Sequence, residues 1–249
     1  MPRRRSPTRV RCSPTILTVA AALLGVSGCL PAPAPPTILY VSASASDQGD
    51  GLSWESAFQD LQDALSLAAE TDSVEEIWVA AGSYRPSMAE DRTATFQLLN
   101  AVAIYGGFAG GEVSREERDS ETNRAILTGD LLGDDASGGS TAENSYHVVT
   151  ASGVDNTAIL DGFTITAGNA NETGNSSGAG VLCDTSNAQI SNCRIVGNTA
   201  QNSGGGIIIL SGNPVLRTCT IQGNVAIANG GGISLVNAAP TIEDCTIQE

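Results

Sequence analysis

The sequence lacks lysine, has one histidine, and contains few aromatic residues, which make up 4% of its 249 residues. Positive charge is also scarce. After residue 29 the chain holds seven arginines against 27 acidic residues, a net charge of −20. Nucleic acids carry dense negative charge, so we predict that a body this acidic binds no nucleic acid. The shortage of aromatic residues, together with 28 glycines, favours a narrow core of stacked strands over a thick sandwich.

The chain also lacks a long apolar run near its start. Residues 16–26 form a run of only about 11 residues, too short to span a bilayer. Five arginines precede this run, and Val26-Ser27-Gly28-Cys29 ends it. Basic, apolar and small-residue regions in this order are typical of an export signal. The last four residues resemble a bacterial lipobox.

We therefore predict a lipoprotein signal peptide over residues 1–29, with Cys29 as the site of lipid attachment. The alternative is an ordinary signal peptide in which Cys29 is incidental. The Pro/Ala-rich residues 30–37 follow as an extended tether. The expected location is outside the cytoplasm, either at the cell outer membrane or cell surface, with the lipid anchoring the chain to the membrane, or extracellular.

One unit recurs every 26 residues after residue 178. Glycine triplets, cysteines, isoleucines, asparagines and prolines repeat in register: Gly178, Gly204 and Gly230; Cys193, Cys219 and Cys245; Ile195, Ile221 and Ile247; Asn198 and Asn224; Pro214 and Pro240. Apolar residues alternate within each unit, as in Val181 and Cys183, which is the period of a strand with one buried face. Turn-forming residues fill the gaps. The unit is therefore several short strands separated by corners.

An all-strand unit that repeats cannot bury its apolar row alone and must stack on its neighbour. Parallel stacking at about 4.8 Å places like residues over like residues. The predicted fold class is all-β, a right-handed parallel β-helix solenoid over residues 38–249. Coils are irregular over 38–156 and more regular over 157–249. The third repeat stops at Glu249 before its coil is complete, so we expect a fragment truncated at the C-terminus.

The repeated columns carry more specific predictions. Residues of one ladder point the same way, which does not suit disulfide geometry, so Cys193, Cys219 and Cys245 are interpreted as a buried thiol ladder. The glycine triplets should turn a corner with positive φ. Asn198 and Asn224 should occupy another corner in the left-handed conformation, with one amide bonded to the next.

An N-terminal capping helix is predicted over Trp54–Ala69, with Ser53 as its N-cap, because apolar residues recur there at spacings of four and three. Such a helix would cover the open sheet edge of the first coil. Strand-like runs follow it: Ile77–Ala80, Thr93–Leu98, Val102–Tyr105, Ile126–Thr128 and Tyr146–Thr150.

These residues carry two resemblances. The glycine triplet followed by an apolar residue, with the step from Ile195 to Asn198, resembles the repeat of chlamydial-type polymorphic outer-membrane proteins. Ile77–Tyr84, Ile104–Phe108 and Leu160–Ile165 are similar to segments of extracellular β-helix proteins of the pectin-lyase-like superfamily. Both resemblances imply a parallel β-helix fold. They do not specify an activity, because one fold hosts many activities.

A polysaccharide lyase or glycoside hydrolase of that superfamily is the alternative function. Such an enzyme needs acids and bases brought together on one face. In the regular coils, Arg194 and Arg217 are 23 residues apart and so lie in different columns. The acidic residues of these coils also fall in different columns. His147 is interpreted as a structural histidine, either with its hydrogen bonds made within the fold or at a strand edge. We predict no catalytic residue. The favoured function is a surface-associated interaction, adhesion or cell-envelope module that binds carbohydrate or protein.

Asp130, Asp134 and Asp135 form the strongest polar cluster, in the segment Thr128-Gly-Asp-Leu-Leu-Gly-Asp-Asp. Calcium prefers several carboxylates on a glycine-rich loop. The spacing does not match the twelve-residue helix-loop-helix pattern. The cluster is therefore either a calcium site or a solvated acidic loop, and the sequence leaves both interpretations open.

Overall fold

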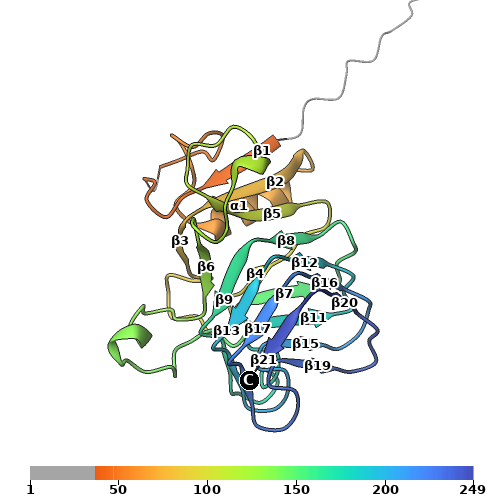
Figure 1. The fold of residues 1–249 in the computed structure, drawn as a ribbon. Coiled ribbons are helices and arrows are strands. Elements are labelled where there is room, and N and C mark those ends of the chain that lie inside the picture. Colours follow the sequence, from red (N-terminus) through yellow and green to blue (C-terminus); the bar gives the residue numbers. More distant parts are fainter. Residues whose placement is uncertain (1–36, 47, 249) are drawn as a thin grey trace, which may run out of the picture. The chain divides into compact units, whose positions relative to one another are not determined.

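The computed structural model describes residues 37–46 and 48–248, which form a stack of parallel strands (Figure 1). The predicted signal peptide, Cys29 and most of the tether lie outside the described residues. Every named strand pair is parallel. The only α-helix of the described part, α1 (Leu61–Glu70), lies near the first strands.

Three sheets run the length of the stack. In stacking order, the first contains β1 (Thr37–Val41), β2 (Val74–Ala80), β5 (Ala103–Phe108), β8 (Ile159–Asp161), β12 (Gln189–Ser191), β16 (Val215–Arg217) and β20 (Thr241–Glu243). The second contains β3 (Gly82–Tyr84), β6 (Ala125–Thr128), β9 (Phe163–Thr166), β13 (Arg194–Val196), β17 (Thr220–Gln222) and β21 (Thr246–Gln248).

The third sheet contains β4 (Phe96–Gln97), β7 (Val149–Ser152), β11 (Val181–Asp184), β15 (Ile207–Ile209) and β19 (Ile233–Leu235). A short fourth sheet consists of β10 (Asn169–Ala170), β14 (Thr199–Ala200) and β18 (Val225–Ala226). Each coil from β8 to β19 therefore visits all four sheets once, as the predicted β-helix requires, while the earlier coils lack the fourth sheet.

Columns of identical residues build the core. Ile195 pairs in register with Ile165 below it and Ile221 above it, and all three side chains are fully buried. Full burial of one such side chain stabilises the fold by about 1.5–3 kcal/mol. The predicted stacking of like on like is confirmed, because the 26-residue period places each strand directly over its predecessor.

The corners follow the prediction at the glycines and differ at the asparagines. Gly178, Gly204 and Gly230 have φ of 74°, 65° and 58°. Asn198 does bond to Asn224, with Nδ2 donating to Oδ1 at 2.9 Å. However, the left-handed residue at each of these corners is the preceding glycine, with φ of 66° and 60°, so the predicted left-handed asparagines are wrong. Glycine takes this conformation without a steric penalty and leaves the asparagine free to turn inward.

The cysteine column is confirmed as a ladder of free thiols. Cys193 and Cys219 are each 1% exposed, whereas Cys245 in the last coil is partly exposed. The backbone N–H of Cys219 donates to the sulfur of Cys245 at 3.4 Å, which fixes their stacking. Burial also raises the pKa of Cys183 to about 12, so this thiol stays protonated.

The helix exists, but its predicted start is wrong. It begins at Leu61, and Asp60 rather than Ser53 is its N-cap, accepting from the N–H of Gln62 at 2.9 Å. The residues before it pair with the first strand instead: the N–H of Phe58 donates to the carbonyl of Tyr40 at 2.9 Å. The helix packs against β1 and β2 of the first coil, burying Leu61, Ala64, Leu65 and Ala68.

Two strand predictions are corrected in length. β4 covers only Phe96–Gln97 of the predicted run 93–98, and β7 begins at Val149 rather than Tyr146.

A long loop separates β6 from β7 and contains a short 3-10 helix, Asp135–Ser137. This loop leaves the regular path of the coil and appears in green in Figure 1. Another 3-10 helix, Arg115–Glu117, follows β5. No helix in the described part of the chain is long and apolar enough to cross a membrane.

Candidate calcium site

The loop after β6 is organised around Asp130, whose residue is 8% exposed. Its carboxylate accepts three backbone N–H groups: those of Gly133 at 2.6 Å, Asp134 at 3.1 Å and Asp135 at 3.2 Å. These bonds fold the chain back on itself directly after the strand. The loop thereby presents two further aspartates beside the first.

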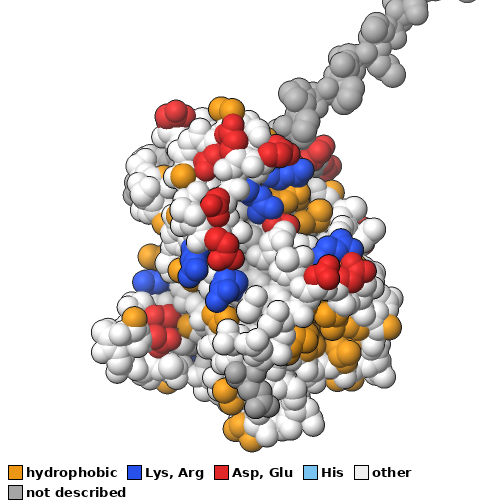
Figure 2. All heavy atoms as spheres, in the orientation of Figure 1, with side chains coloured by type: hydrophobic (Ala, Val, Ile, Leu, Met, Phe, Trp, Pro, Cys, Tyr) orange, Lys and Arg blue, Asp and Glu red, His pale blue; other side chains and the backbone are white. Residues whose placement is uncertain are grey.

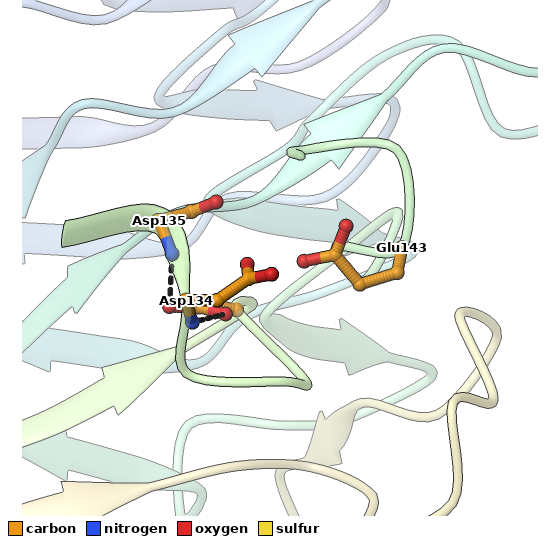
Figure 3. A group of neighbouring side chains, drawn as sticks. Asp134, Asp135 and Glu143 are labelled. Atoms are coloured by element: carbon orange, nitrogen blue, oxygen red, sulfur yellow. Dashed lines mark hydrogen bonds between the residues drawn. The ribbon is translucent and has the colours of Figure 1, made fainter. Parts of the chain in front are cut away.

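Four carboxylates converge in this loop. One ligand oxygen from each of Asp130, Asp134, Asp135 and Glu143 lies within 4.8 Å of the others. Figure 2 shows acidic side chains gathered on this loop, and Figure 3 shows the carboxylates of Asp134 and Glu143 pointing toward each other. The structure thus brings the three predicted aspartates together. It also adds Glu143, which sequence reasoning missed because it follows Asp135 at a distance that no motif marks.

Several oxygens of the cluster are buried without a partner. Asp134 Oδ1, Asp135 Oδ1 and Glu143 Oε1 are inaccessible to solvent and accept no hydrogen bond from the described residues. The ion pairs of the described chain involve other residues, so no arginine forms an ion pair with the cluster, although Arg92 lies near Glu143. Carboxylates held this close repel one another unless a proton or a cation lies between them.

An amide also lies at the edge of the cluster. Asn144 is 1% exposed, and its Nδ2 donates to Asp135 Oδ2 at 2.8 Å and to the carbonyl of Ala167 at 2.9 Å. Its Oδ1 is buried and has no partner among the described residues. The amide atom that faces the carboxylates is therefore Nδ2, which holds the Asp135 carboxylate in place.

The Asp134 carboxylate occupies space that is free because Gly139 has no side chain. A Cβ built on Gly139 would lie 2.1 Å from the carboxyl carbon of Asp134. The N–H of Gly139 also donates to the carbonyl of Asp134 at 2.9 Å. A side chain at position 139 would therefore push the Asp134 carboxylate out of the cluster.

This donor set suits calcium. Calcium accepts six to eight oxygen ligands at about 2.3–2.6 Å in irregular geometry, whereas magnesium demands a near-ideal octahedron and retains water. The four carboxylates are all oxygen donors on a loop. Zinc prefers nitrogen and sulfur donors, which this cluster does not contain.

The other polar residues singled out in the sequence lie apart from this cluster. His147 Nδ1 hydrogen-bonds to the carbonyl of Gly178 at 2.9 Å, and burial lowers its pKa. Arg194 and Arg217 lie in different sheets, which confirms the prediction that they occupy different columns. Sequence reasoning missed the ion pair from Arg217 to Glu243 at 2.7 Å, although their spacing of 26 residues signals it.

Comparison with known proteins supports the fold. A family model described as a right-handed beta helix region matches residues 137–249, from the loop after β6 through the regular coils. No curated protein and no solved structure matches the chain. With the parallel sheets, this match makes the protein an all-β, right-handed parallel β-helix with an N-terminal helix. It does not extend to the resemblance with polymorphic outer-membrane proteins.

Proposed function

We propose that this chain is an exported, non-enzymatic β-helix module that binds calcium in the loop after β6 and acts in interaction or adhesion at the cell surface. One observation carries the proposal: Asp134, Asp135 and Glu143 each hold a buried, unpaired oxygen in one cluster with Asp130. A divalent cation removes the repulsion among these groups and supplies the missing partner for each oxygen.

The surface location is supported by the leader. The lipobox-like end at Cys29 would anchor the chain in a membrane of the cell envelope, and the Pro/Ala tether would hold the β-helix away from it. Calcium is abundant outside cells, where binding sites of moderate affinity are commonly occupied. A loop that is ordered by calcium would therefore take its final form only after export.

Calcium titration tests this proposal. We expect calorimetry of the purified chain to show one calcium site, and we expect calcium to raise the melting temperature. Replacing Asp135→Asn removes one charged ligand and should weaken calcium binding by at least about tenfold, since changes merely adjacent to metal ligands already cost 10–100-fold.

A matched control removes the same charge elsewhere. Asp72→Asn lies in an exposed turn and should leave the calcium affinity unchanged. If the unaltered chain shows neither heat nor a shift in melting temperature, the calcium site does not exist. If Asp135→Asn binds calcium as tightly as the control, the ligands are assigned wrongly.

The non-enzymatic part needs its own assay. The purified chain is incubated with a panel of acidic polysaccharides in calcium buffer, and unsaturated products are read by ultraviolet absorbance while reducing ends are measured chemically. We expect neither signal above that of the buffer. Formation of either product would replace the adhesion proposal with the lyase or hydrolase alternative.

A further inference from the structure

A cavity of about 450 Å³ adjoins the candidate calcium site. Asp130, Asp135 and Asn144 form the wall that it shares with the cluster, and Thr166, Asn169 and Thr199 lie on other sides. Cavities that hold small ligands commonly measure about 300–1,000 Å³. A ligand in this cavity would therefore meet the calcium ion and the side chains of the stack together.

Threonine hydroxyls line this cavity. Thr128 in β6 and Thr166 in β9 are register partners in adjacent coils, so their side chains point the same way about 4.8 Å apart. The hydroxyls of Thr141, Thr166 and Thr199 make no hydrogen bond within the part of the chain that the structure describes. Each can donate and accept, which suits a ligand that itself carries hydroxyls.

The protein donors leave room in the calcium shell. Asp130, Asp134, Asp135 and Glu143 supply about four oxygens if each binds through one atom, and calcium takes six to eight. About two to four positions therefore remain for water or for a ligand. Asp130 and Asp135 line the cavity, so the open positions are expected on that side.

Charge decides which ligand fits. Four carboxylates and one calcium ion leave a charge of about −2, which the neighbouring Arg92 reduces to about −1. The cavity itself is lined by two aspartates and by no arginine or histidine. An anionic ligand would meet this negative field, and Arg92 already donates to the carbonyls of Asn144 and Asn169 and to the side chain of Asn171. A neutral ligand with two adjacent hydroxyls meets no such electrostatic repulsion.

We infer that the cavity beside the loop after β6 binds a neutral saccharide, whose two vicinal hydroxyls complete the calcium shell while threonine hydroxyls hold the ring. This inference rests on the proposed calcium site and names the ligand class of the surface module.

The test uses two sugars that share one cis-diol. Methyl galactoside is neutral, and methyl galacturonoside carries a carboxylate in addition. Ligand-observed NMR of the purified chain in calcium buffer should show binding of the galactoside, and EDTA should abolish it. The galacturonoside should bind several-fold more weakly because of the negative site.

Thr166→Val removes one hydroxyl with little change of shape and should weaken galactoside binding by about fivefold, the value of one hydrogen bond. Thr164→Val is the matched control on the same face of β9, outside the cavity, and should bind as the unaltered chain does. If Thr166→Val folds poorly, Thr199→Val at an exposed position replaces it.

Calcium affinity is measured for each variant in parallel, which separates the two proposals. A chain that binds no calcium defeats the calcium site and this inference with it. A chain that binds calcium but no galactoside, or that binds galactoside equally well in EDTA, defeats this inference alone. Tighter binding of the galacturonoside would overturn the assignment to neutral saccharides.

Discussion

Gly139→Ala should impair calcium binding without removing any ligand atom. The added Cβ would lie 2.1 Å from the Asp134 carboxyl carbon, far inside contact distance, so the carboxylate must leave the cluster. Gly139 does not have a positive φ, so alanine introduces no backbone strain there. The displaced carboxylate also relieves repulsion in the calcium-free chain. We therefore expect the variant to be at least as stable as the unaltered protein in EDTA.

The effect appears when calcium is added. A ligand at 100 times its Kd stabilises the folded state by about 2.7 kcal/mol, and a tenfold loss of affinity reduces this to about 1.4 kcal/mol. At about 2–4 °C per kcal/mol, calcium should raise the melting temperature by about 5–11 °C in the unaltered chain and by half as much in Gly139→Ala.

Differential scanning calorimetry in EDTA and in calcium measures both states. Gly111→Ala is the matched control, because a Cβ there meets nothing within 4 Å. The reasoning is refuted if Gly139→Ala and Gly111→Ala gain the same stability from calcium. It is also refuted if Gly139→Ala loses stability in EDTA, since the loop would then need Asp134 in place for folding alone.

Three further predictions concern the scaffold and the leader. Asn198→Ala should lower the free energy of unfolding, measured by denaturant titration, by about 3 kcal/mol. The fully buried amide makes four hydrogen bonds, and several of its partners would be left unpaired. A loss below about 1 kcal/mol would contradict this. Burial lowers the pKa of His147, so the unfolded chain binds a proton first and stability should fall as pH drops below about 6.5; His147→Gln should lose that part of the decline. Cys29→Ser should abolish incorporation of labelled palmitate in a bacterial host, whereas Cys12→Ser should retain it, and equal labelling of both would disprove the lipobox.

The fold was predictable because its signal is repeated. Ile195, Ile221 and Ile247 recur at one spacing, and a stack of parallel strands is the structure that places them in one column. Ile195 and Ile221 are fully buried there, and Ile247 in the last coil is 51% exposed. The start of α1 was not predictable by the same route. Trp54 and Phe58 continue the helical spacing, yet Trp54 packs its ring 4.9 Å from that of Tyr40, and Phe58 pairs with the first strand. The spacing of these residues fits a helix, but their contacts with the first strand decide the structure that they adopt.

The candidate site shows a different limit. Asp130, Asp134 and Asp135 were visible because they lie within six residues on a glycine-containing segment. Glu143 and Asn144 were not, since their place in the cluster depends on how the loop returns to the stack. That return is fixed by long-range contacts: Arg92 donates to the carbonyl of Asn144 at 2.7 Å and to that of Asn169 at 3.0 Å.

The position of the loop explains why the described residues of the regular coils carry no comparable carboxylate cluster. In a ladder, each column repeats one residue type at about 4.8 Å, so carboxylates in one column would repel their copies along the whole stack. Four carboxylates can converge only where the chain leaves the repeat and does not have to reproduce the same cluster in the next coil. The loop between β6 and β7 is such a place, and it still reaches the threonines of β6 and β9. In this β-helix, the regular coils therefore supply a rigid surface with hydroxyl groups, and the irregular loop supplies the charge that a cation requires.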